Sequence, residues 1–93
     1  MTATPAPPAA VSPDSVDTAY CFLHQKERVY AHSTMEWQRD DIECAISAYA
    51  DSMSPALYAA LSAGNAGFLH DHARFHDDLR QALHALEGMM ASR

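Results

Sequence analysis

Residues 68–90 read FLHDHARFHDDLRQALHALEGMM, and this stretch decides the fold class. Its apolar residues and two of its histidines recur every three or four positions, which is the spacing of one face of an α-helix. The members of this series are Leu69, His72, Phe75, His76, Leu79, Leu83, Leu86 and Met90. The pattern predicts one long amphipathic helix over residues 68–90 that buries this face.

A second amphipathic helix is predicted over residues 14–32. Ser12 or Asp14 can cap its first turn, where Pro13 is tolerated because the first amides of a helix have no partner within it. The face expected in the core consists of Val16, Ala19, Tyr20, Leu23, Glu27 and Tyr30.

The sequence of residues 33–36 fits a capping box, in which the Ser33 hydroxyl and the Glu36 carboxylate accept hydrogen bonds from each other's backbone amides. A third helix is therefore expected to begin there and to end near Ser52. No glycine or proline separates it from the helix before it, so one long kinked helix is the alternative. Its buried residues are expected to be Met35, Ile42, Ala45, Ile46, Tyr49 and Met53.

A short helix is predicted over residues 55–63. Ser54 is a good N-cap, Pro55 suits the first helical position, and Gly64 favours a stop at the C-terminal end. A tight connection then leads into the last helix.

These elements predict an all-α fold, namely a small antiparallel helical bundle of three long helices plus one short helix. Residues 1–13 hold four of the five prolines and no charged side chain. They are predicted to form a disordered Pro/Ala-rich tail, because such a segment has little to bury. Residues 14–93 are predicted to be a single helical-bundle domain.

Twelve acidic and six basic side chains give a net charge of -6. The basic residues are scattered, so direct binding to nucleic acid is not expected. No apolar run approaches the roughly 18 residues that a membrane span needs. Without a basic segment at the N-terminus a secretory signal is not expected either, which predicts a cytoplasmic protein whose Cys21 and Cys44 stay free thiols.

The residues His72 and His76 stand four positions apart in the last predicted helix, the spacing of helical zinc ligands. Glu27 interrupts the apolar face of the first helix, so its carboxylate needs a partner. No cofactor is expected, but Glu27, His72 and His76 would together suit zinc or iron with an open coordination position. A polar network in the core and a Glu27 side chain that extends to solvent are the other two interpretations.

An acidic stripe of Glu36, Asp40 and Glu43 lies about 110° from the apolar face of the middle helix at 100° per residue, so it is expected to face solvent. The chain has no nucleophile elbow, phosphate-binding glycine loop or Cys-x-x-Cys motif. An enzyme is therefore not expected.

Two of the predicted helices carry apolar residues outside their main buried face. In so small a bundle a second apolar face is covered by internal packing or by another chain. The leading hypothesis is a small helical protein-protein interaction module that forms a homodimer, and the alternative is a metal- or small-ligand-binding bundle that uses Glu27, His72 and His76. The expected interface residues are Tyr20, Phe22, Val29, Trp37 and Cys44.

Overall fold

The structure, a computed structural model, describes residues 13–92, and these residues form an all-α fold of three long helices and one short helix. The tail predicted over residues 1–13 lies outside the described residues, except for Pro13. The elements in chain order are α1 (Pro13–His32), α2 (Glu36–Ser52), α3 (Pro55–Ser62), the 3-10 turn η1 (His72–Arg74) and α4 (Phe75–Ala91). The predicted fold class is confirmed.

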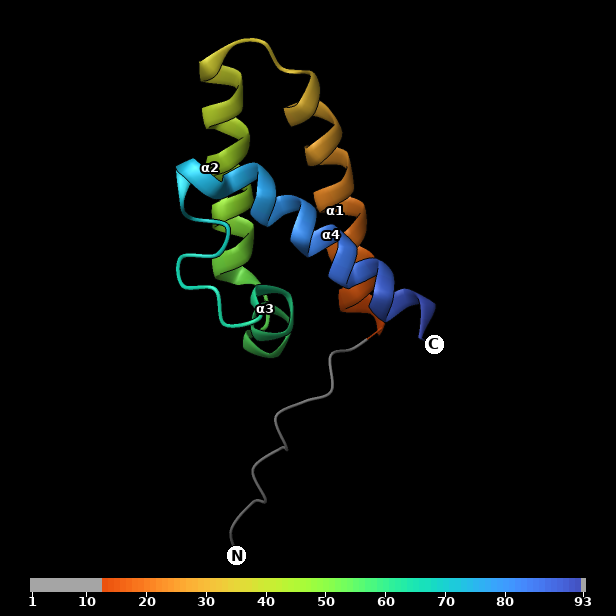
Figure 1. The fold of residues 1–93 in the computed structure, drawn as a ribbon. Coiled ribbons are helices and arrows are strands. Elements are labelled where there is room, and N and C mark those ends of the chain that lie inside the picture. Colours follow the sequence, from red (N-terminus) through yellow and green to blue (C-terminus); the bar gives the residue numbers. More distant parts are fainter. Residues whose placement is uncertain (1–12, 93) are drawn as a thin grey trace, which may run out of the picture.

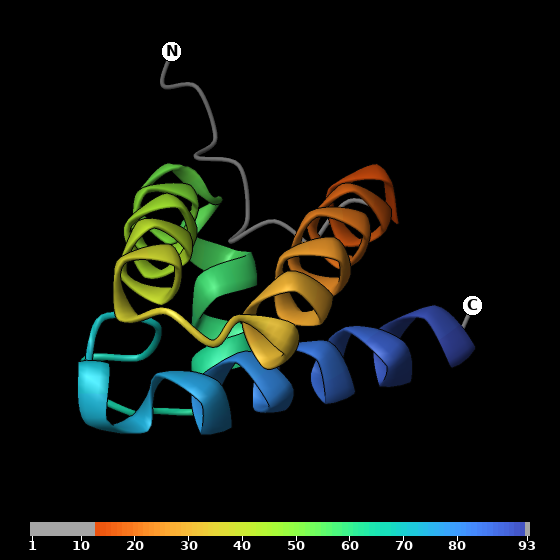
Figure 2. The ribbon, with the colours of Figure 1, turned by 90° about the horizontal axis from the view of Figure 1, so that it is seen from above.

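The helices α1 and α2 run antiparallel and form a hairpin that α4 crosses diagonally (Figure 1). Seen from above, α4 extends along one face of the α1 and α2 pair (Figure 2). The short helix α3 follows α2 at the opposite end from the hairpin connection, and α4 packs against both α1 and α3.

The core lies between α4 and the hairpin, and it contains most of the apolar residues that the helical periodicity placed inside. Large side chains from every helix are fully buried in it. The buried apolar residues are Val16, Ala19, Leu23, Tyr30, Ile42, Ile46, Ala50, Leu57, Leu61, Phe68, Leu69, Phe75, Leu79, Ala82, Leu83 and Leu86.

The predicted break between α1 and α2 is confirmed, but the predicted capping box is wrong. The Ser33 hydroxyl donates backwards to the Val29 carbonyl at 2.7 Å, and Met35, in extended conformation, precedes α2 without a side-chain cap. The prediction that Met35 is buried is also wrong, since 52% of it is exposed. Its extended backbone takes it off the inward face of the helix that follows.

The short helix α3 begins as predicted and ends one residue early. The Ser54 hydroxyl accepts a hydrogen bond from the Leu57 amide at 3.1 Å, as an N-cap residue does. Ala63 and Gly64 both have left-handed backbone, with φ of 50° and 80°, and this reversal of hand ends the helix.

The helix predicted from Phe68 begins only at Phe75, which corrects the start of the last helix. Gly67 and Leu69 have φ of 76° and 62°, so the backbone there is incompatible with a right-handed helix. Phe68 and Leu69 nevertheless reach the core from this connection and are fully buried. Phe68 and Leu69 occupy core positions, as helical residues would, although their backbone is not helical. The apolar spacing therefore extends beyond the N-terminal end of the helix itself.

Buried Asp78 of α4 holds the connection in place. One carboxylate oxygen accepts from the Leu69 amide at 3.2 Å and the other from the Asn65 side-chain amide at 3.0 Å. The Ser47 hydroxyl donates to the Leu69 carbonyl and the Tyr58 hydroxyl to the Phe68 carbonyl, each at 2.7 Å. These bonds satisfy the Leu69 amide and the carbonyls of Phe68 and Leu69, the two fully buried residues of a mostly exposed connection.

None of the described helices combines the length and the apolar character that crossing a bilayer requires.

Candidate functional site

The sequence leaves open whether Glu27 meets His72 and His76, and in the structure it meets His76. Glu27 points from α1 towards the crossing α4, where its Oε2 lies 3.1 Å from His76 Nε2. Both side chains are partly exposed, so the pair lies at the edge of the core. The Tyr30 ring, 5.4 Å from the His76 ring, lies next to this pair.

The other histidine of the predicted ligand set, His72, pairs with Glu43 rather than with Glu27. His72 is in η1 rather than in α4, so it does not share a helix face with His76. Its Nδ1 lies 2.8 Å from Glu43 Oε1, and the Tyr30 hydroxyl donates to Glu43 Oε2 at 2.7 Å. Glu27, His72 and His76 therefore belong to two separate pairs, and Tyr30 contacts one member of each.

The expectation that Glu43 faces solvent is wrong, because the residue is only 9% exposed. The buried residues of α2 are Ile42, Glu43, Ile46 and Ala50, so Glu43 belongs to the same buried side of the helix as the apolar residues. A buried carboxylate requires hydrogen bonds, and Tyr30 and His72 provide them.

The pKa values of His72 and Tyr30 are shifted in the directions that these contacts predict. The hydrogen bond to Glu43 and the charge of that carboxylate raise the pKa of His72, and Asp40 and Glu36 contribute in the same direction. Burial, followed by the hydrogen bond to Glu43, raises the pKa of Tyr30 to about 12. Tyr30 is therefore a protonated donor at neutral pH, and the charged form of His72 is favoured.

Within the described part of the chain, one group of three potential metal ligands converges. Asp40, Glu43 and His72 each offer one ligand atom, and these atoms lie within 4.8 Å of one another. The spacing of Asp40 and Glu43 places two carboxylates on one side of a helix, which the sequence does reveal. The contribution of His72 is not visible in the sequence, because η1 reaches α2 only through the tertiary fold.

The five predicted interface residues divide into two groups. Tyr20 and Phe22 make internal contacts: the Tyr20 hydroxyl donates to Glu87 at 3.2 Å, and the Phe22 ring stacks on Tyr49 with centroids 4.2 Å apart. Val29, Trp37 and Cys44 are exposed. The second apolar face of α1 is thus partly covered within the chain.

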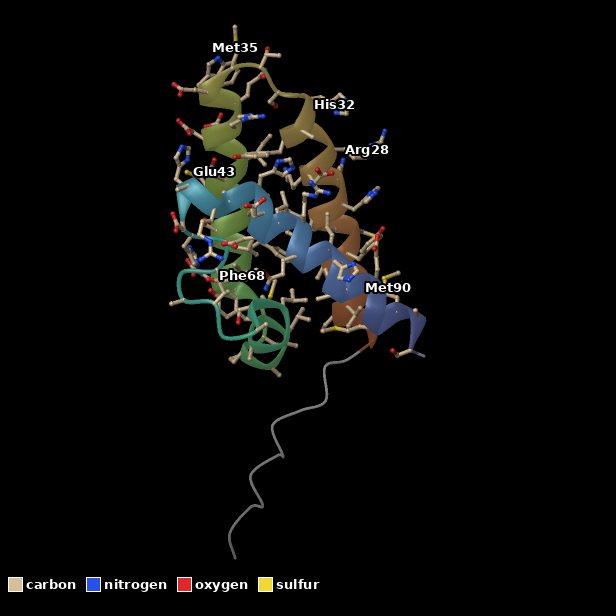
Figure 3. All side chains as sticks on the ribbon, viewed as in Figure 1. Arg28, His32, Met35, Glu43, Phe68 and Met90 are labelled. Carbon is tan, nitrogen blue, oxygen red and sulfur yellow. The ribbon has the colours of Figure 1, made fainter. Side chains whose placement is uncertain are left out.

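Large exposed apolar side chains gather where α1 ends and α2 begins. Val29, Met35 and Trp37 are 52%, 52% and 60% exposed, and we call this group the hairpin end. Figure 3 shows Met35 and the nearby Arg28 and His32 at this end of the molecule. A shallow depression of about 610 Å³ lies beside it, lined by His24, Gln25, Arg28, Val29, His32, Ser33 and Gln38.

The fold and these sites define a small all-α protein with two histidine-carboxylate pairs around a buried tyrosine and an apolar hairpin end. No family model, curated protein or solved structure matches the chain.

Proposed function

We propose that this protein is a small helical interaction module that forms a homodimer through the hairpin end. The observation that carries the proposal is the exposure of Val29, Met35 and Trp37 together at one end of the fold. Tryptophan and methionine are enriched at interfaces, and tryptophan is among the residues that contribute most to binding.

Charge favours a second copy of the same chain as the partner. Asp41 stands four residues after Trp37, so the two share one face of α2. Arg28 of α1 borders the depression beside Val29. An indole with an adjacent carboxylate on α2 is therefore complementary to an apolar depression with an adjacent guanidinium on α1.

Both halves of this contact are present on every chain. In a two-fold dimer, Trp37 of each copy enters the depression beside Val29 of the other copy, and Asp41 meets Arg28. The two contacts are equivalent and close the assembly, as an isologous interface requires. A contact that depends on three large apolar side chains from each chain would be small, as is typical of a weak and reversible dimer.

Sedimentation velocity over a concentration series tests the proposal on tag-free protein with reducing agent. We expect a monomer-dimer equilibrium whose dissociation constant rises at least about tenfold in Trp37→Ala and much less in Trp37→Phe. His84→Ala, on the exposed side of α4, is the matched surface control and should leave the constant unchanged. A monomer at every concentration, or a dimer indifferent to Trp37→Ala, would overturn the proposed interface.

A charge exchange tests both whether the partner is a second copy of this chain and whether Arg28 faces Asp41 in the dimer. Arg28→Glu and Asp41→Lys each place like charges opposite each other in a homodimer, so each variant alone should associate less than wild type. In an equimolar mixture both contacts pair opposite charges again, and we expect association to return. If the mixture does not associate, Arg28 of one copy does not contact Asp41 of the other, and the proposed arrangement of the dimer is wrong.

The proposed module has no enzymatic activity, and it works in the cytoplasm. The first statement rests on the sequence, which carries no nucleophile elbow, phosphate-binding glycine loop or Cys-x-x-Cys motif. The second is consistent with two free thiols, which are typical of a reducing compartment.

A further inference from the structure

A polar cluster remains outside the hairpin end and its proposed role. It joins two carboxylates of α2, Asp40 and Glu43, to an imidazole of η1, His72. The histidine stands 29 residues after Glu43 in the chain, so the fold itself brings a nitrogen donor to the carboxylates.

We infer that Asp40, Glu43 and His72 form a binding site for a divalent transition-metal ion of the zinc type. Zinc takes carboxylate oxygen and imidazole nitrogen at about 2.0–2.2 Å, which puts the ligand atoms of a tetrahedral site about 3.4 Å apart. The three atoms already lie within 4.8 Å of one another. Asp40 and His72 are exposed, so small side-chain rotations close the remaining gap.

Tyr30 supports the site from behind. Its hydroxyl donates to Glu43 Oε2, which leaves Oε1 directed towards His72. Metal-bound carboxylates characteristically have such a second hydrogen bond, because it fixes the orientation of the ligand oxygen. Glu43 is nearly fully buried, so this ligand is already held in place without the ion.

The local charge and the donor types determine which ion fits. Two carboxylates favour a cation, and Glu36 adds negative potential at His72. The nearby guanidinium of Arg39 lies over the Tyr30 ring, 5.0 Å from its centroid, rather than between the carboxylates. An imidazole ligand favours zinc over calcium or magnesium, which prefer oxygen.

Three protein ligands leave a coordination position open to water or to a group from outside. The ion also connects α2 to the turn that leads into α4, so its binding stabilises the folded chain. This site does not depend on the hairpin end, and each proposal can fail without the other.

Isothermal titration with zinc chloride tests the site on tag-free protein treated with a chelator. Cys21→Ser and Cys44→Ser are introduced in all samples, because the two exposed thiols would otherwise bind zinc. We expect about one ion per chain and a rise in the midpoint of thermal unfolding when zinc is added.

The variants identify the ligands. His72→Ala and Asp40→Asn should each weaken binding at least about tenfold, and Tyr30→Phe about 10–100-fold, as expected for loss of an outer hydrogen bond. His70→Ala is the matched control, since His70 pairs with Asp51 at 3.1 Å without a third ligand. Absence of saturable binding, or equal losses in His70→Ala and His72→Ala, would refute the site.

Discussion

Asp78 is the residue whose side chain contributes most clearly to the geometry of the fold. Its two oxygens satisfy the Leu69 amide and the Asn65 side chain, and it is 2% exposed. In Asp78→Ala the buried Leu69 amide loses its hydrogen-bond acceptor, and Leu69 is also the residue whose backbone has positive φ. We expect the free energy of unfolding in urea to fall by about 2–4 kcal/mol.

The neighbouring residue provides the control for this measurement. Asp77 belongs to the same turn of α4 but is exposed. Asp77→Ala should therefore change the free energy of unfolding by no more than about 0.5 kcal/mol. Equal effects of the two substitutions would mean that Asp78 acts only through the charge of the first helical turn.

Single residues also show what the sequence reveals and what it conceals. The Ser54 cap was predictable, because its chemistry involves only the next three residues. The burial of Glu43 was not predictable, because its partners Tyr30 and His72 come from separate elements. The need of Glu27 for a partner was evident from the sequence, but the choice of His76 rather than His72 was left open.

Among the elements, the start of α4 shows where periodicity fails. Phe68 and Leu69 continue the apolar period of α4 and are buried, as helical residues would be. Their backbone is a turn, however, because Leu69 has positive φ. The available signal was Asp71, whose side chain caps η1 by accepting from the Ala73 amide at 3.1 Å.

The segment that includes η1 and the first turn of α4 is attached to the hairpin by three histidine-carboxylate pairs. His70 pairs with Asp51, His72 with Glu43, and His76 with Glu27. Each pair is an ion pair only when its histidine is protonated. The pKa of His72 is raised, so the attachment through its pair with Glu43 is expected to depend on pH.

The pKa of His72 gives the sign of that dependence. It is raised in the folded state above the ordinary value of about 6.5, mainly by Glu43. The stabilisation is complete below that ordinary value and is lost as the pH rises through the higher folded pKa. Urea unfolding in the presence of EDTA should show lower stability at pH 8 than at pH 6.

A variant isolates the contribution of His72 from that of the other pairs. His72→Gln retains a hydrogen-bond donor but does not titrate. Tyr30 stays protonated in this range, since its pKa is about 12. We expect a smaller stability difference between pH 6 and pH 8 in His72→Gln than in wild type. An unchanged difference would assign the effect to other groups.

For the whole molecule, the sequence predicts the class of fold better than the arrangement in space. Helical periods and caps are local, so the four helices were expected. The diagonal crossing of α4 over the hairpin depends on which faces meet (Figure 1). His72 lies in η1, before α4 begins, and for this reason the ligand set expected from one helix is divided between two carboxylates.

A chain of 93 residues has a small core, so association should contribute measurably to its stability. If the native chain dimerises and the unfolded chain does not, the midpoint of thermal unfolding must rise with protein concentration. In a domain of this size, each kcal/mol gained by association shifts the midpoint by about 4–8 °C.

Calorimetry over a hundredfold concentration range, with EDTA to exclude metal, should show this rise of the unfolding midpoint in wild type. The rise should be much smaller in Trp37→Ala, because its dimer is weaker by at least about tenfold. Trp37 is exposed, so its loss should change the stability of the monomer little. An equal rise in both proteins would move the dimer contact to another face, and a constant midpoint in wild type would make the chain a monomer.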